Sequence, residues 1–140
     1  MPVNTFVLLC ITSQAPEELG IVNDAFELAR ERNPLLQLVV ADEHCSPSLF
    51  QTSDLLICLG EDPVAATAIP RAQALGLPVL AVEGGPVAGL VESGRSGFIV
   101  PSGAVALSDA IRWLARRGPV RARLRIGGLL AAGHRLAVSA

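Results

Sequence analysis

Residues that could bind or react with a ligand follow three of the apolar segments in this sequence. Glu61 and Asp62 come directly after the apolar run 54–59, and Gly84 and Gly85 follow the run 77–82. Carboxylates in such a place can hold sugar hydroxyls or transfer protons, but an acid near a helix start also serves as a partner of the helix dipole. Two glycines allow a ligand close to the backbone, or simply make a sharp turn. The candidate binding residues are Ser13, Gln14, Glu61, Asp62, Gly84 and Gly85.

Metal, disulfide and nucleophile chemistry are not indicated elsewhere in the chain. Residues 42–45 (DEHC) are metal-ligand types, but adjacent residues on an extended loop point in different directions and seldom converge on one ion, so no metal is expected. The three cysteines form no C-x-x-C pair, and Cys10 and Cys58 are predicted to be small core residues. No Ser-His-Asp or Cys-His arrangement is recognisable, because His44 is predicted in a loop and His134 on the exposed side of a helix.

Apolar, β-rich segments alternate with segments of helical periodicity along the chain. The predicted strands are 5–12, 35–41, 54–59, 77–82 and 98–100, the second and third apolar enough to be covered by helices on both faces. The predicted helices are 16–32, 47–52, 64–75, 86–92, 104–117 and one from about 120 onward. The expected buried faces are Ile21, Ala25, Leu28 and Ala29 on the first helix and Leu107, Ile111 and Leu114 on the fifth.

Proline and glycine are expected to shape three of these helices. Pro70 lies within the third, and because an interior proline costs about 3 kcal/mol, two shorter pieces are predicted there. Pro86 suits the first turn of a helix whose amino end would face the carboxyl edge of the preceding strand. Gly127 and Gly128 are expected to soften the last helix.

Alternating strands and helices predict an α/β fold. We expect a single Rossmann-like doubly wound domain over residues 1–140, with a parallel sheet of about five strands and helices on both faces. The composition, 51% hydrophobic and 17% charged, suits one compact domain of this length. Apolar stretches never reach the roughly 18 to 20 residues that span a bilayer, and no leader sequence is recognisable, so a cytoplasmic location is expected.

The stretch 75–103, LGLPVLAVEGGPVAGLVESGRSGFIVPSG, carries a family resemblance. Its GLPV, its GG and its VESGRSGFIVPSG resemble the C-terminal, donor-nucleotide domain of GT-B glycosyltransferases of the retaining, glycogen-synthase-like group one. The order of elements extends this resemblance from about Phe6 to Ala132. It implies half of a GT-B fold that takes a nucleotide-sugar, such as a UDP- or GDP-sugar, at the carboxyl edge of the strands. The candidate binding residues named above would then surround the nucleotide.

This sequence departs from the family at its charged positions. The family's arginine and lysine, which neutralise the donor diphosphate, would fall at Gln14 and Leu19. Its paired glutamates, eight residues apart, would fall at Pro63 and Arg71, and a slipped loop would bring only Glu61 to the first place. Two hypotheses therefore stay open: one half or a divergent subunit of a nucleotide-sugar glycosyltransferase, inactive alone, and a non-catalytic relative that binds a nucleotide or a protein.

The C-terminal segment 119–140 is predicted to be an arginine-rich terminal helix. In two-domain relatives of the family this helix crosses to the N-terminal domain, so its apolar side chains would lack their usual cover. These are Leu129, Leu130, Leu136 and Val138. The helix could also fold back on its own sheet. A protein partner supplying the N-terminal acceptor domain, or a second copy, is the favoured cover, and an anionic membrane surface is an alternative through Arg116, Arg117, Arg121, Arg123 and Arg125. Nucleic acid is not expected, because no aromatic residue follows Trp113 and the net charge is -2.

Overall fold

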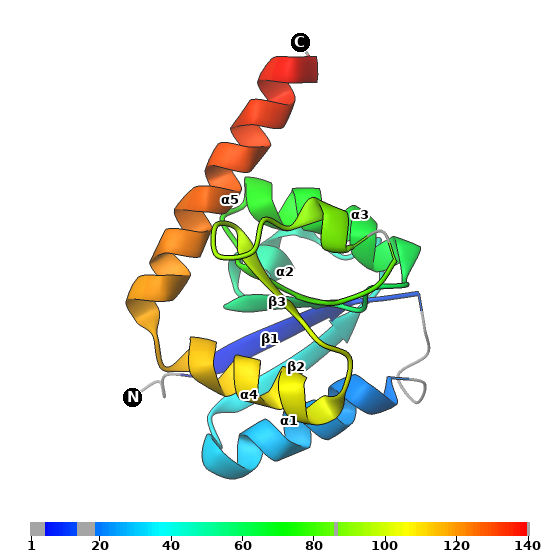
Figure 1. Cartoon of the computed structure of the whole chain (residues 1–140), viewed down its shortest axis with the longest axis vertical. Helices are drawn as coiled ribbons and strands as arrows, with labels where there is room; N and C mark the ends of the chain where they lie inside the picture. The colour runs from blue at the N-terminus through cyan, green and yellow to red at the C-terminus, as the bar shows by residue number, and fades with distance from the viewer. Residues whose placement is uncertain (1–4, 14–18, 86, 140) are drawn as a thin grey trace.

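The computed structural model describes residues 5–13, 19–85 and 87–139. These residues form a three-layer α/β structure, with helices on both sides of a sheet (Figure 1). The strands are β1 (Phe6–Ile11), β2 (Leu36–Ala41), β3 (Leu55–Cys58), β4 (Val79–Val82) and β5 (Gly97–Val100). The helices are α1 (Gly20–Arg32), α2 (Pro47–Gln51), α3 (Pro63–Ala74), the 3-10 turn η2 (Ala88–Leu90), α4 (Ala104–Ala115) and α5 (Gly118–Ser139). Each predicted strand is found within about two residues of its expected bounds.

The five strands form one parallel sheet in the order β2-β1-β3-β4-β5. The chain runs outward from β1 to β2, returns to β3 on the other side of β1, and continues outward to β5. The loops that follow β1 and β3 therefore diverge to opposite faces, and this reversal leaves a crevice at their carboxyl ends. The predicted doubly wound α/β fold is confirmed.

Helices cover both faces of the sheet. One face packs on α1 and α4, whose buried side chains include Ala25, Leu107 and Ile111, and the other packs on α2 and α3. Strands β3 and β4 are buried along their whole length because helices lie over them on both sides. Strand β2 differs: it ends the sheet, and its last four residues are only half-buried, although they pack against the buried clusters on both faces.

Helix α1 buries a different face from the predicted one. Ala25 and Ala29 are buried as expected, but Ile21 and Leu28 are exposed by 42% and 39%, and Val22 is buried in their place. Small side chains at the contact bring the helix close to the sheet and leave the larger ones at its margin. The helix begins at Gly20, and Pro16, its predicted start, lies outside the described residues.

The two proline predictions fail for packing reasons. Helix α3 runs through Pro70 without a break, because its face of Ala65, Ala68 and Ile69 is fully buried, and this burial offsets the missing hydrogen bond. The helix predicted over 86–92 is only the turn η2. Val91 is already extended and buried, so the chain leaves the helical conformation before residue 92. Pro86 itself lies outside the described residues.

Helix α5 is continuous through the two glycines expected to soften it. A Cβ atom at Gly127 would overlap the backbone carbonyl of Arg95, and one at Gly128 would touch Gln73 of α3 at 3.5 Å. The glycines therefore let α5 lie close to the 94–96 turn and to α3. Beyond this contact Leu129 and Leu130 are exposed by 40% and 70%, as expected. The side chains of Leu136 and Val138 lie outside the described part.

Candidate functional site

A cavity of about 600 Å³ opens at the carboxyl edge of the sheet, where the chain reverses between β1 and β3. Its walls come from the start of α1, the loop after β3, the end of β4 and the loop after β5. The lining residues are Leu19, Ile21, Val22, Leu59, Gly60, Glu61, Asp62, Val82, Glu83, Gly84 and Ser102. In a doubly wound sheet this crevice is where ligands bind.

Asp62 joins the loops that follow β1 and β3. Its carboxylate accepts hydrogen bonds from the Thr12 hydroxyl at 2.6 Å, from the Ser13 amide at 3.1 Å and from the Ser13 hydroxyl at 3.0 Å. It also accepts one from the Val64 amide at 2.9 Å and thereby caps α3. The residue is only 4% exposed. Asp62 therefore holds the cavity floor together, and its oxygens are occupied before any ligand arrives.

The protonation of Asp62 follows from these contacts. Burial by itself would raise its pKa, but the hydrogen bonds from Thr12, Ser13 and Val64 outweigh burial and hold the pKa below its ordinary value. The group is an ionised carboxylate at neutral pH and does not serve as a proton donor. Of the two carboxylates predicted after β3, only the exposed Glu61 is free of such a network in the structure.

The glycines of the site have distinct roles. A Cβ atom at Gly85 would overlap the carbonyl of Gly60, and one at Gly60 would overlap the carbonyls of Val82 and Gly84, so the loops after β3 and β4 touch backbone to backbone. Gly85 also has a φ of 56° and does not line the cavity. Gly84, with a φ of 110°, lines it and has only Glu61 near its missing side chain, at 3.9 Å. Of the predicted pair, Gly84 alone offers its backbone to a ligand.

The cavity wall is acidic. Glu61, Asp62 and Glu83 line it, and among its lining residues in the described part of the chain there is no lysine or arginine. Leu19, where the resemblance implies a cation, is a lining residue but is 1% exposed and packs in the core. An apolar side chain therefore occupies one of the family's cationic positions, and Gln14, the other, lies outside the described residues.

The residues at the family's glutamate positions lie apart from the cavity lining. Pro63 begins α3, and Arg71 stacks its guanidinium over the Phe50 ring at 4.7 Å. Arg71 also donates hydrogen bonds to the carbonyls of Glu43 and Cys45, at 3.0 and 3.1 Å. It therefore fastens the loop after β2 to α3, and its role is structural.

Several lining residues were not among the sequence candidates. Glu83 follows β4 directly and Ser102 is the second residue after β5, so the reasoning that selected Glu61 would have found both had it been applied to every strand. Ile21 was assigned to the core and lies on the cavity rim. Ser13 lies at the end of β1 and is tied to Asp62 but does not line the cavity.

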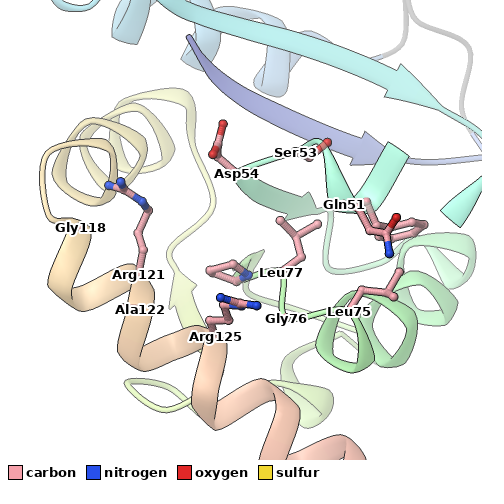
Figure 2. Close-up of a pocket in the computed structure, with 12 residues that line it drawn as sticks. Gln51, Ser53, Asp54, Leu75, Gly76, Leu77, Gly118, Arg121, Ala122 and Arg125 are labelled. Carbon is pink, nitrogen blue, oxygen red and sulfur yellow. The ribbon is translucent and has the colours of Figure 1, made fainter. Parts of the chain in front are cut away.

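A second cavity, of about 540 Å³, lies at the opposite, amino edge of the strands (Figure 2). Two of its charged side chains, Arg121 and Asp54, already make contacts within the domain. Arg121 donates to the carbonyls of Leu114 and Ala115 at the end of α4 and stacks over Phe6 at 5.0 Å. The Asp54 carboxylate accepts a hydrogen bond from the Val7 amide at 2.8 Å. We interpret this cavity as the seam along which α5 joins the domain.

The cysteines and the metal-ligand types carry no chemistry visible in the structure. Burial, followed by the nearby charge of Asp62, raises the pKa of the Cys10 thiol to about 12. Burial is also the main cause that raises the pKa of Cys58, so both are inert core residues as predicted. Within residues 5–13, 19–85 and 87–139, no three His, Cys, Asp or Glu side chains are grouped as a metal site would need.

Solved glycosyltransferase structures share this arrangement of strands and helices. Anabaena HepE in complex with UDP and glucose superposes with a TM-score of 0.80 at 20% identity over 94% of this chain. The chain has the fold of a glycosyltransferase domain. The C-terminal domain of a group 1 family glycosyl transferase (LpcC) from Francisella tularensis gives 0.76 at 14% identity over 97% of it. The resemblance in 75–103 is thus confirmed for the fold, which is half of a GT-B glycosyltransferase.

The glycosyltransferase fold is matched over one domain only. This chain spans 44% of the HepE chain, 44% of a glycosyltransferase from Rickettsia africae and 88% of the isolated LpcC domain. No protein-family model matches the sequence, and no curated protein matches it. None of the helices in the described residues is long and apolar enough to cross a membrane.

Proposed function

We propose that this chain is the donor-nucleotide domain of a glycosyltransferase and takes a nucleotide-sugar in the cavity after β1, β3 and β4. The observation that carries the proposal is this cavity, at the switch point of a fold shared with HepE, whose structures contain UDP and UDP-glucose. Its volume, about 600 Å³, suits a ligand of that size.

The composition of the wall predicts which part of a nucleotide-sugar is held. Glu61 and Glu83 are acceptors for ribose or sugar hydroxyls, and the backbone at Gly84 is open to a close approach. These carboxylates carry the same sign of charge as a diphosphate and therefore do not contribute to binding it. Two missing cation contacts, each worth about 1.5 to 3 kcal/mol, weaken binding by roughly two to four decades. We therefore expect weak binding, with most of the recognition at the nucleoside or sugar.

Sugar transfer is expected to need a second domain. A GT-B active site lies between two domains, and a single domain leaves the cleft open to water. The exposed apolar side chains Ile126, Leu129 and Leu130 on α5 are a fitting place for that domain or for another copy of the chain to dock. Docking on anionic membrane lipids is the weaker alternative, since Arg121 caps α4 and Arg117 stacks over Trp113 at 4.5 Å.

The alternative function is a non-catalytic relative that binds a nucleotide or a protein. The acidic wall favours it, because Leu19 stands where a cation would neutralise the leaving diphosphate. Both functions use the same fold and the same cavity. They differ in whether a second domain restores transfer.

Calorimetry with UDP-glucose tests the proposed site. Replacing Ile21 on the cavity rim by tryptophan fills the entrance and should abolish the heat of binding. Val105→Trp, at an even more exposed helical site outside the lining, should leave the heat of binding unchanged. The purified chain should release no sugar. Micromolar or tighter binding of UDP that Ile21→Trp leaves intact would place the ligand elsewhere, and donor hydrolysis lost on Glu61→Gln would show that the chain is active alone.

A gain-of-function variant tests the charge explanation separately. Ile21→Lys adds a cation at an exposed rim position, so folding should tolerate it. One contact to the diphosphate should raise the affinity for UDP by about one to two decades, and Ile21→Met should not. Equal affinities for the two variants would mean that the diphosphate does not lie near the start of α1.

A further inference from the structure

Strand β2 lies at one end of the sheet and has an unpaired edge. It is the last strand on its side, and its side chains from Leu38 to Ala41 are half-buried. Neighbouring apolar side chains on both faces, Phe26 of α1 and Leu49 of α2, are also only partly buried. The strand, LQLVVA, has no charge, proline or glycine to discourage pairing. No described segment covers this edge.

The direction of the free backbone groups follows from the pairing with β1. Phe6 and Thr12 donate their amides to the carbonyls of Leu35 and Ala41, at 3.1 and 3.0 Å. The backbone N–H and C=O groups of the odd-numbered residues of β2 therefore point toward β1. Those of Leu36, Leu38 and Val40 point away from it. The amide of Leu36 donates to Asn33. The amides of Leu38 and Val40 and the carbonyls of all three remain for a partner.

Charges at the two ends of β2 indicate which partner fits. Arg30, whose guanidinium lies 5.9 Å from the Phe26 ring centroid, is in the last turn of α1 beside the start of β2. Asp42 and Glu43 follow the end of β2. If two copies pair antiparallel about a two-fold axis at Leu38, the start of each β2 lies beside the end of the other. Arg30 of each copy then comes near the acids of its mate, while a parallel pairing would place like charges together.

We propose that the β2 edge pairs antiparallel with β2 of a second copy and joins the two sheets into one. Leu38 faces Leu38 of the other copy, and Leu36 faces Val40. The free groups make about four backbone hydrogen bonds, and the residues that meet on the α1 face are all apolar. This interface leaves the carboxyl-edge cavity and α5 open. It does not depend on the proposed function.

The test is sedimentation velocity on the full chain over a concentration series. A monomer–dimer equilibrium is expected. Arg30→Glu and Glu43→Arg should each raise the dimer dissociation constant about tenfold. The double variant should restore the original dissociation constant, because the exchanged charges attract again. The matched control is Arg123→Glu, the same charge change at an exposed position on α5, which should have no effect.

Two further observations identify the surface. Leu38→Pro removes an amide that faces away from β1, so the variant should fold as a monomer, which circular dichroism verifies. In the dimer the amides of Leu38 and Val40 should be protected from hydrogen exchange. A chain that stays monomeric at every concentration overturns the proposal, as does a dimer that Leu130→Glu disrupts and Leu38→Pro leaves intact.

Discussion

Replacing Asp62 by asparagine should destabilise the domain and do so in a pH-dependent way. The carboxylate accepts four hydrogen bonds, two of them from the buried Thr12 hydroxyl and the Val64 amide at the start of α3. Losing a helix cap costs about 0.5 to 2 kcal/mol, and leaving a buried donor without its acceptor costs about 1 to 3 kcal/mol. Asparagine keeps one acceptor oxygen, so we expect a loss of about 1.5 to 3 kcal/mol at neutral pH.

The sign of the pH dependence follows from the lowered pKa of Asp62 in the folded state. Its contribution is complete above the unfolded-state pKa, about 3.9, and is lost as the pH falls through the lower folded-state value. Urea denaturation should therefore show a large difference between the wild type and Asp62→Asn at pH 7 and a smaller one in acid. The control Asp109→Asn removes an exposed partner of Arg112 and should cost less than about 1 kcal/mol. A difference that does not change with pH, or no destabilisation, would refute the assigned role of Asp62.

The other predictions concern thiols and helix packing. In the native chain only Cys45 should react readily with a thiol reagent, because Cys10 and Cys58 are buried; reaction of all three at one rate in the folded state would contradict the structure. Gly127→Ala should destabilise the domain, since its Cβ would overlap a backbone carbonyl, whereas Gly133→Ala, with nothing within 4 Å, should be neutral or stabilising by up to about 1 kcal/mol. Thermal denaturation measures both, and equal effects would mean that α5 does not rest on the 94–96 turn.

The sheet could be predicted from the sequence because its strands are short apolar runs with turn residues between them. Strands buried on both faces need no alternation, and β3 and β4 show none. The order β2-β1-β3-β4-β5 was not predicted, because the apolar sequence of a strand does not say which strands it pairs with. What remained ambiguous was β2, whose apolar sequence is equally consistent with a buried strand and with an open edge.

The errors have a common cause, which is tertiary packing. Helix α1 has two apolar stripes at helical spacing, one with Ile21 and Leu28 and one with Val22 and Ala29, and periodicity alone does not say which one meets the sheet. Pro70 is tolerated because the rest of α3 is buried, a fact absent from its local sequence. The local sequence sets the helix propensity of these segments, but burial in the fold decides which face of α1 is covered and whether α3 continues through Pro70.

Of the residues predicted for the site, some line the carboxyl-edge cavity and others do not. Glu61 and Gly84 line the cavity because they follow strands at the switch point. For Asp62 the sequence left two roles open, a ligand contact and a partner of the helix start, and in the structure it caps α3. Its contacts with Thr12 and Ser13 were not predicted, because these residues lie about fifty positions away in the chain and converge only in the fold. Contacts over such separations have no local sequence signal.

The most direct test of the proposed function is amide chemical-shift mapping of the labelled full chain with UDP-glucose. The carboxyl-edge site predicts saturable shifts at Gly60, Glu61, Gly84 and Ser102, which surround one cavity. These shifts should be absent in Ile21→Trp. Shifts confined to the amino edge, around Gly76, or no shifts at any concentration of the sugar nucleotide, would contradict the assignment of this domain as a nucleotide-sugar site.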